Sequence, residues 1–495
     1  MEAERNKTYP WMHSRANWRT ILCGCFAVAG MTFHKDFPEY RALIEYGLEG
    51  VLVGLDAGDR AGGWDEGPGY WDYGLSYAVR FASALRIFTG GAVDLFRHPF
   101  LRKTGDFRLY MTTGPDRLWN WSDCSKTAGA SMTIIGLARA YGNPVYQRMA
   151  LDQGITTLGH LYWLDPRLKP QAPRRYPLTK RFPDLGLMVM RGGFGPRDPY
   201  VGIKAGDIPE LNYHSHLDQG EVVIFAEGRE LLAELEKWPY PYEGDRKADG
   251  KKTKTGFYDE ELKRYKRRDF DDVGAIGHNI VTIEGNYPRA RVGVKARFLR
   301  AESHRGHDVA VVDSTPYHRP VASRVRRYLV YLRPDVVVLV DEVRAREPVQ
   351  ARVLYHYLTS DQAAACGVEE AGAGVNCGAD TFTITSGPAQ LRWQSLHPCQ
   401  ADHLVLGRDD RTTTYRPPAG LAARRNQYLY VQNLYRKPRL VFVAAMQFGK
   451  KAMRPARFTL EGKPASDSHF SVRVRRGAKT ARVQFDLAAV AVKVS

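Results

Sequence analysis

The sequence predicts a multidomain α+β protein in which helices come first and antiparallel strands follow. Up to about residue 160, apolar side chains recur at helical spacing, and from about residue 186 short β-branched and aromatic runs alternate with turn residues. Helices followed by strands are typical of α+β chains, whereas alternation of the two would indicate a βαβ fold. At 495 residues, 44% of them hydrophobic, the chain is long enough for roughly two to four domains.

Three segments of the N-terminal part are predicted to be helices: residues 17–31, 77–88 and 131–141. Their apolar residues fall three or four positions apart, so each helix has one face that can be buried. A glycine-rich stretch, residues 58–69, separates the first helix from the second. We expect this helical domain to cover residues 1–165.

The rest of the chain is predicted to form antiparallel sheets. The clearest signal is a hairpin in which Arg333-Pro334-Asp335 forms the turn between two apolar runs. We expect a central sheet domain over residues 180–390 and a C-terminal sheet layer over residues 391–495. A charged insertion, residues 237–272, is expected to be an exposed loop that either is a solvated excursion or overhangs the site.

Composition limits the partners. The net charge of +18 points to a polyanion, which can be nucleic acid, anionic lipid or an acidic polysaccharide. No nucleic-acid-binding module or concentrated basic helix is present, so nucleic acid is the weakest of the three. No signal peptide is visible, and the apolar run at residues 21–33 is too short to span a membrane. The six cysteines form no Cys-x-x-Cys pair, which argues against a disulfide framework or a cysteine zinc site.

Histidines give the strongest chemical signal. His214 and His216 lie two residues apart in a segment, residues 212–218, that reads as a β-strand. Side chains two apart on a strand point to the same face, so both rings can address one cavity. His278 begins a second strand-like run, residues 278–283. Two interpretations stay open: ordinary hydrogen-bonded histidines, or one metal ligand beside one proton carrier.

With these pieces in order, the chain resembles the heparinase II/III-like polysaccharide lyases. Residues 17–23 look like the family's Asn-Trp helix, and residues 66–74 like the start of its tyrosine-bearing helix. Residues 214–218 and the hairpin after them look like its His-x-His strand. Residues 278–285 look like its His-Asn strand. The resemblance implies an incomplete α/α toroid followed by antiparallel sheets. Because residues 1–165 hold too few helices for a toroid, we expect an N-terminally truncated or a compact form.

The resemblance also implies a reaction, β-elimination at a uronic acid. A base removes the proton beside the carboxylate, an acid protonates the leaving oxygen, and a neighbouring group neutralises the carboxylate. By position, His214 matches the histidine that acts on the substrate, and Asn17 matches the neutralising residue. Tyr73 matches the catalytic tyrosine, with Tyr70 as the alternative.

Other positions are assigned more loosely. Trp18 stands where many members carry a second histidine, and this departure weakens a mechanism with two catalytic histidines. Tyr258 is a candidate second tyrosine of the catalytic site. Tryptophans such as Trp71 and Trp121 are either sugar-stacking platforms or core residues. The expected substrate-binding residues are Trp18, Glu66, Tyr70, Trp71, Trp121 and Tyr265.

A metal site is implied as well. His216 and His278 match the family's zinc ligands, and Glu234 falls where the family has an aspartate. Glutamate is a competent zinc ligand that is one methylene longer. The expected Zn²⁺ is structural, holding the segment that presents His214.

The leading hypothesis is therefore a lyase that cleaves an acidic polysaccharide, glycosaminoglycan-like or alginate-like. A uronyl C5-epimerase of the same fold and a non-catalytic polyanion-binding protein are the alternatives. The family implies a periplasmic or extracellular location, and a homodimer is compatible with the sequence.

Overall fold

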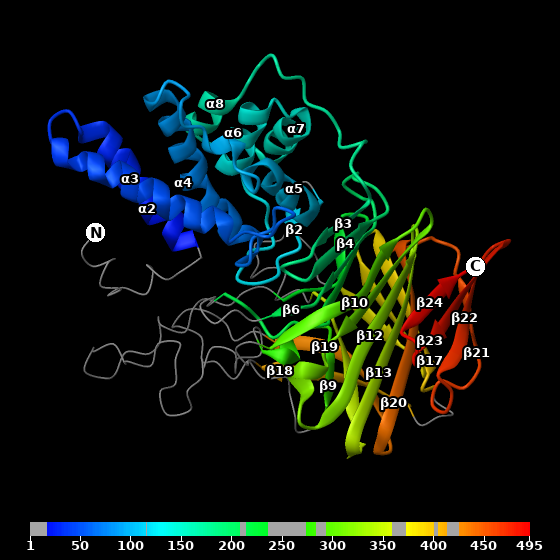
Figure 1. Ribbon diagram of the computed structural model, residues 1–495. Coiled ribbons are helices and arrows are strands. Elements are labelled where there is room, and N and C mark those ends of the chain that lie inside the picture. The colour runs from blue at the N-terminus through cyan, green and yellow to red at the C-terminus, as the bar shows by residue number, and fades with distance from the viewer. Residues whose placement is uncertain are drawn as a thin grey trace. The chain divides into compact units, whose positions relative to one another are not determined.

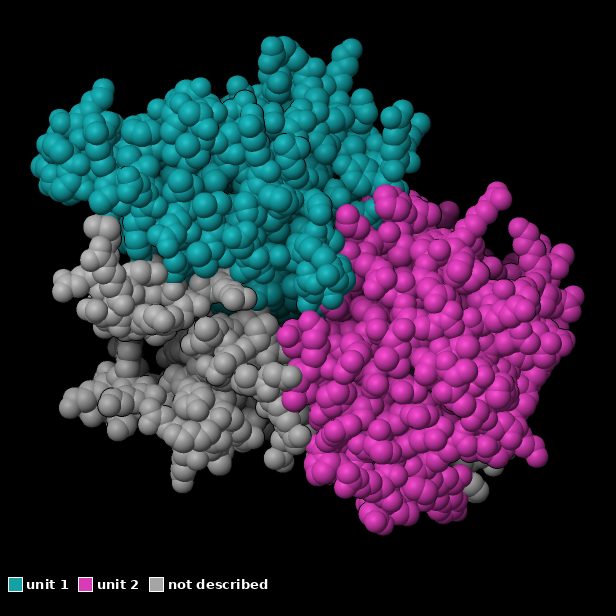
Figure 2. Space-filling model, viewed as in Figure 1, with its two compact units in different colours: residues 1–176, 182–185, 209–215 teal, residues 177–181, 186–208, 216–495 magenta. Residues whose placement is uncertain are grey.

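The computed structural model describes residues 17–114, 116–207, 214–235, 274–283, 294–358, 373–399, 404–412 and 425–495. The chain divides into two compact units, coloured separately in Figure 2. Unit 1 comprises residues 1–176, 182–185 and 209–215, and unit 2 comprises residues 177–181, 186–208 and 216–495. Among the described residues, no helix is both long and apolar enough to cross a membrane.

Unit 1 is helical, as the sequence predicts. The predicted helices 17–31 and 131–141 are confirmed, and the segment 77–88 is the second half of a longer helix that begins at Gly67. The α-helices are α2 (Asn17–Phe33), α3 (Arg41–Asp56), α4 (Gly67–Phe88), α5 (Leu101–Met111), α6 (Met132–Tyr141), α7 (Pro144–Gln153) and α8 (Leu158–Trp163). Short 3-10 turns lie at Pro38–Tyr40 and Leu95–Arg97, and β1 (Thr112–Gly114) pairs with β2 (Arg117–Leu118) in a two-stranded ribbon.

Capped helix ends and a close contact between α2 and α4 stabilise the helices of unit 1. Ser131, Asn143 and Thr157 cap α6, α7 and α8 by accepting backbone N–H groups with their side chains. The start of α2 lies against α4 at Gly74, where an added Cβ would come within 2.9 Å of the Asn17 Cβ. A larger residue at position 74 would therefore push Asn17 away from α4.

Unit 2 consists of antiparallel sheets (Figure 1). The largest has nine strands in the order β15 (Gly374–Cys377), β16 (Thr381–Ser386), β17 (Ala389–His397), β20 (Lys437–Lys450), β13 (Val336–Val349), β12 (Ala322–Leu332), β11 (His307–Asp313), β10 (Lys295–Ser303) and β6 (Gly206–Asp207). A five-stranded sheet has the order β3 (Thr179–Phe182), β4 (Leu187–Arg191), β5 (Tyr200–Lys204), β7 (Val222–Ala226) and β8 (Arg229–Leu232).

Two four-stranded sheets complete the unit. One has the order β18 (Leu404–Thr412), β19 (Arg425–Asn433), β14 (Ala351–His356) and β9 (Val281–Ile283). The other is C-terminal and has the order β21 (Arg457–Glu461), β22 (His469–Arg476), β23 (Lys479–Asp486) and β24 (Ala491–Val494).

The nine-stranded sheet is the middle layer of unit 2, and both faces of its central strands contribute to buried cores. Val337 and Leu339 of β13 belong to the core shared with the five-stranded sheet and with β14 and β19. Val336, Val338 and Val340 belong to the core shared with the C-terminal sheet. Burial on both sides explains why the first half of β13 begins with an apolar run, residues 336–340, because no residue of that run faces water.

The structure confirms one expectation about the strands and corrects three others. The Arg333-Pro334-Asp335 hairpin is confirmed as the β12–β13 turn. The segment that carries His214 and His216 is a turn and loop before β7, and His278 lies before β9, which begins only at Val281. The boundary expected at 391 falls inside β17, a strand of the nine-stranded sheet, and the separate C-terminal sheet starts at Arg457. The charged insertion 237–272 lies outside the described residues.

Candidate functional site

In unit 1, His214 lies between two carboxyl groups and a tyrosine ring. Its Nδ1 is 2.8 Å from Asp123 Oδ2, and its Nε2 is 3.5 Å from Glu66 Oε1. The ring of Tyr70 stacks on the imidazole, with 3.8 Å between centroids and 20° between planes. The His214 side chain is 14% exposed, so a ligand has only a narrow approach to it.

The loop before α6 supplies Asp123 and also holds the histidine backbone. Ser122 has a φ of 62°, in the left-handed region that non-glycine residues rarely adopt, at a cost of about 1 to 3 kcal/mol. Its hydroxyl donates to the His214 carbonyl oxygen over 2.6 Å. Strain of this kind persists where the surroundings fix the conformation, and the next residue, Asp123, lies 2.8 Å from His214 Nδ1.

Glu66 is the second carboxyl group, and it is buried at the start of α4. Its oxygens accept from the Asn17 backbone N–H over 2.6 Å, the Asn17 amide over 2.7 Å and the Trp64 indole over 3.0 Å. Burial raises the pKa of Glu66 to about 8, against the opposing effect of these hydrogen bonds. Glu66 is therefore largely protonated and neutral below that pH. Gly67, with a φ of 86°, allows the helix to begin here, because an added Cβ would lie 2.6 Å from the Trp121 carbonyl oxygen.

This arrangement selects one nitrogen of His214 for proton transfer. When Asp123 accepts a proton from Nδ1–H, the lone pair of the neutral ring lies on Nε2. Nε2 is thus the atom that can take a proton, and Asp123 stabilises the imidazolium that results. Asp123 was not among the residues expected from the sequence, because nothing local marks it.

The other expected residues of unit 1 divide into three groups. Tyr70 contacts the histidine, whereas Tyr73 is half exposed on the next turn of α4, its ring 6.4 Å from that of Tyr70. Trp18 is 56% exposed. The expectation that Trp71 and Trp121 bind substrate is corrected: both are core side chains, with indole N–H groups bound to Thr104 Oγ1 and Met111 Sδ.

Asn17 also differs from its expected position. Its side chain is buried and its amide is committed to Glu66. In the described structure, Asn17 is therefore a buried hydrogen-bond partner of the Glu66 carboxyl group. Tyr258 and Tyr265 lie outside the described residues.

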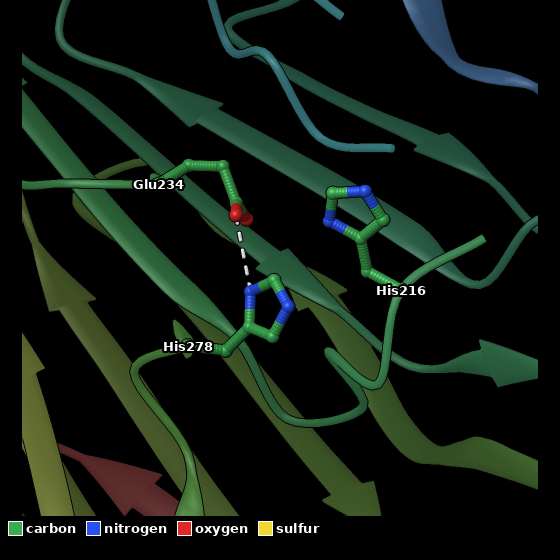
Figure 3. A group of neighbouring side chains, drawn as sticks. All are labelled: His216, Glu234 and His278. Atoms are coloured by element: carbon green, nitrogen blue, oxygen red, sulfur yellow. Dashed lines mark ion pairs between the residues drawn. The ribbon is translucent and has the colours of Figure 1, made fainter. Parts of the chain in front are cut away.

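Unit 2 brings together the three expected metal ligands, His216, Glu234 and His278 (Figure 3). They come from the loop before β7, the segment after β8 and the turn before β9. All three are fully buried, and one ligand atom from each lies within 4.8 Å of the others. His278 Nδ1 is 3.0 Å from Glu234 Oε1, and the two imidazole centroids are 5.4 Å apart.

The electrostatics of this cluster fit a divalent cation. Burial raises the pKa of Glu234 to about 8 although His278 opposes the rise, and burial raises the pKa of Glu221 as well. Burial lowers the pKa of His278, but the two carboxylates outweigh it and hold that pKa well above its usual range. The neighbouring Asp218 already pairs with Lys204. A bound Zn²⁺ would supply the positive charge that these buried carboxylates require, and both ligand types suit it.

Asn279 ties the cluster to the surrounding strands. Its amide donates to Glu221 Oε1 over 2.7 Å and to the carbonyl oxygens of Val222 and Ala233. Its Oδ1 accepts from the His356 backbone N–H over 2.5 Å. One side chain thus joins β7, the segment after β8 and β14. The sequence offered a signal for it, since it follows His278 directly, but gave no indication of its contacts.

Arg327 on β12 binds the backbone of the loops that carry His216 and His278. Its guanidinium forms a bidentate pair with Asp341, at 2.7 and 3.0 Å, and donates to the carbonyl oxygens of Gly220 and Asn279. Because its hydrogen bonds go to these buried partners, the Arg327 guanidinium holds the backbone of the two loops in place, and its charge is balanced by Asp341.

Comparisons with known proteins identify the family and the fold of this chain. The family model for the heparinase II/III-like C-terminal domain matches residues 174–441, more than half of the chain. No curated protein matches its sequence. Among solved structures, heparan sulfate lyase HepC from Pedobacter heparinus is 13% identical with a TM-score of 0.67 and covers 94% of this chain. A heparinase III structure is 14% identical with a TM-score of 0.69 and covers 95%.

The chain is shorter than these neighbours. It spans 65% of the HepC chain and 67% of the heparinase III chain. At such identities the likeness shows the fold, helices followed by antiparallel sheets. Together with the family match over residues 174–441, it shows that this chain belongs to the heparinase II/III-like family.

Proposed function

We propose that the protein is a lyase that cleaves a uronic-acid-containing polysaccharide by β-elimination. The observation that carries the proposal is the setting of His214, with Asp123 on Nδ1, Glu66 facing Nε2 and Tyr70 stacked on the ring. Two acid–base side chains in contact are what abstraction of one proton and delivery of another require. The net charge of +18 suits a polyanionic substrate, and the similar structures include a heparan sulfate lyase.

In the proposed reaction, His214 Nε2 takes the proton from the carbon beside the uronate carboxylate. The electron pair of that C–H bond forms a double bond to the adjacent ring carbon, and the bond from that carbon to the glycosidic oxygen breaks. The Tyr70 hydroxyl donates its proton to the departing oxygen. The products are an unsaturated uronate and a new hydroxyl end.

Asn17 and Glu66 are proposed to keep the carboxylate's surroundings free of negative charge. Below about pH 8 Glu66 is neutral, so the Asn17–Glu66 pair does not repel a uronate. The developing charge on the carboxylate can then be stabilised by amide and carboxylic acid dipoles held in fixed positions. The tyrosine preferred here is Tyr70, and Tyr73 remains the alternative.

We further propose that His216, Glu234 and His278 hold a structural Zn²⁺. Bound there, the ion would bring three chain segments of unit 2 together and would take no part in proton transfer. Purified protein should contain about one zinc per chain, and a metal content near zero with unchanged melting after chelation would refute the proposal.

Three broader features belong to the same proposal. The helices of unit 1 are proposed to form part of an α/α toroid, supported by the short connections between α2 and α3 and between α6 and α7. The periplasmic or extracellular location is the one that the family resemblance implies. A homodimer is proposed as well, and the molecular mass of the protein in solution would test it.

The test is to incubate the protein with heparin, heparan sulfate, chondroitin, hyaluronan, alginate and ulvan and to follow the absorbance of the unsaturated uronate. A rise on at least one substrate is expected. Deuterium incorporated from D₂O into an uncleaved chain would instead indicate a C5-epimerase. Binding with neither product would indicate a non-catalytic polyanion-binding protein.

A further inference from the structure

The C-terminal sheet presents two pairs of arginines directly opposite each other. Arg457 on β21 is the register partner of Arg475 on β22, and Arg473 on β22 is the register partner of Arg482 on β23. Like charges directly opposite on neighbouring strands are destabilising. The fold carries this repulsion twice in one small sheet.

These arginines all lie on one face, which we call the outer face. The alternate residues, among them Phe470, Val472, Val474 and Phe485, form the core against the nine-stranded sheet. Because side chains alternate along a strand, the arginines point the opposite way. Arg473 and Arg482 are about half exposed, at 53% and 49%.

Acidic groups do not balance this face. Glu461 is shared by Arg473 and Arg482, whose Nη2 lies 2.9 Å from Glu461 Oε2. Arg457 and Arg475 are exposed and form no ion pair with any described residue. Lys493 on β24 adds a further exposed cation beyond Gln484. Asp486 on β23 also lies on this face and pairs with His469, with 2.9 Å between its Oδ2 and the histidine Nε2. The outer face therefore holds five arginine or lysine side chains and two carboxylates.

We propose that the outer face is an accessory binding surface for the acidic polysaccharide, engaging a stretch of chain that is not being cleaved. The inference rests on the proposed function, since it takes the same substrate class. Cations about 7 Å apart along a strand and about 5 Å apart across strands suit a polymer with closely spaced anionic groups. Arginine guanidinium groups bind carboxylates through two parallel hydrogen bonds, and sulfates present equivalent oxygens.

The face suits a polysaccharide better than single-stranded nucleic acid. Its remaining outward positions include threonine, serine, glutamine and the His469–Asp486 pair, but no phenylalanine, tyrosine or tryptophan that could serve as a platform for base stacking. Binding a polyanion would also relieve the repulsion within each arginine pair.

The test compares Arg457→Gln/Arg475→Gln with a control of equal charge change, Lys35→Gln/Arg41→Gln, at exposed positions just after α2 and at the start of α3. Heparin affinity is measured by calorimetry over a series of salt concentrations, and turnover is measured on a short oligosaccharide. Because affinity is measured without turnover, failure of the lyase proposal leaves this result interpretable.

The Arg457→Gln/Arg475→Gln protein should bind heparin about threefold to tenfold more weakly at low salt. Its slope of log affinity against log salt should fall by roughly one to two. Its thermal midpoint should be equal or higher, and its turnover of the oligosaccharide unchanged. Equal heparin affinity of the two double variants would overturn the proposal. An equal loss of affinity for a DNA duplex of similar charge would overturn the assignment to a polysaccharide.

Discussion

Glu66→Gln tests the electrostatics of the site most sharply, because it removes the titration and keeps the shape. The wild-type carboxyl group has a pKa of about 8, raised by burial from 4.5. A group whose pKa is higher in the folded state stabilises fully below its unfolded pKa and loses that contribution as pH rises through the folded value. Wild-type stability should therefore fall between pH 4.5 and 8 by about 4 to 5 kcal/mol from this residue.

Glutamine has a different, pH-independent cost. The two Glu66 oxygens accept three N–H groups from Asn17 and Trp64. Replacing one oxygen by an amide NH₂ leaves at least one of these buried donors without an acceptor, which costs about 1 to 3 kcal/mol. The variant should thus be less stable than wild type near pH 5 and more stable near pH 9.

The assay is denaturant unfolding followed by tryptophan fluorescence from pH 5 to 9, since Trp64 contacts Glu66 directly. Glu39→Gln, at an exposed carboxylate, is the control and should follow the wild-type curve. Other buried titrating groups are the same in all three proteins, so the difference isolates Glu66. Parallel stability curves for Glu66→Gln and wild type would refute a raised pKa at this position.

The remaining predictions concern single roles. His214→Ala should reduce turnover by about a hundredfold or more and leave the melting temperature unchanged. His216→Ala should lose both bound zinc and thermal stability. Identical behaviour of the two variants would contradict separate roles for the two histidines. Tyr70→Phe should reduce turnover far more than Tyr73→Phe in steady-state kinetics, and the reverse order would restore Tyr73 as the acid. Asn279→Ala should destabilise unit 2 by about 2 to 4 kcal/mol in denaturant titrations, because Glu221 and two carbonyl groups lose their donor.

The sequence predicted the general architecture because local periodicity determines it. Apolar spacing located α2 and α6, and the turn at Arg333-Pro334-Asp335 located the β12–β13 hairpin. The grouping of His216, Glu234 and His278 could also be anticipated, because the family resemblance placed these three residues at one site. The prediction from local spacing that His214 and His216 lie on one strand was wrong, however, because they lie in a turn and loop.

Long-range contacts explain the rest of the differences. Asp123 reaches His214 across 91 residues and Glu66 binds Asn17 across 49, so no local pattern marks either pair. The sequence left open whether Trp71 and Trp121 are sugar-stacking platforms or core residues, and the folded chain buries both. The choice between Tyr70 and Tyr73 depends on where the turn of α4 meets the imidazole, which only the folded chain defines.

The central claim is that His214 Nε2 removes the proton beside a uronate carboxylate. The most direct measurement is the absorbance of unsaturated uronate when wild type and His214→Ala are each incubated with heparan sulfate and the other acidic polysaccharides. The account predicts a rise for wild type on at least one of them and none for the variant, with both proteins folded by circular dichroism. No rise for folded wild type on any polysaccharide, or an equal rise for the variant, would contradict it.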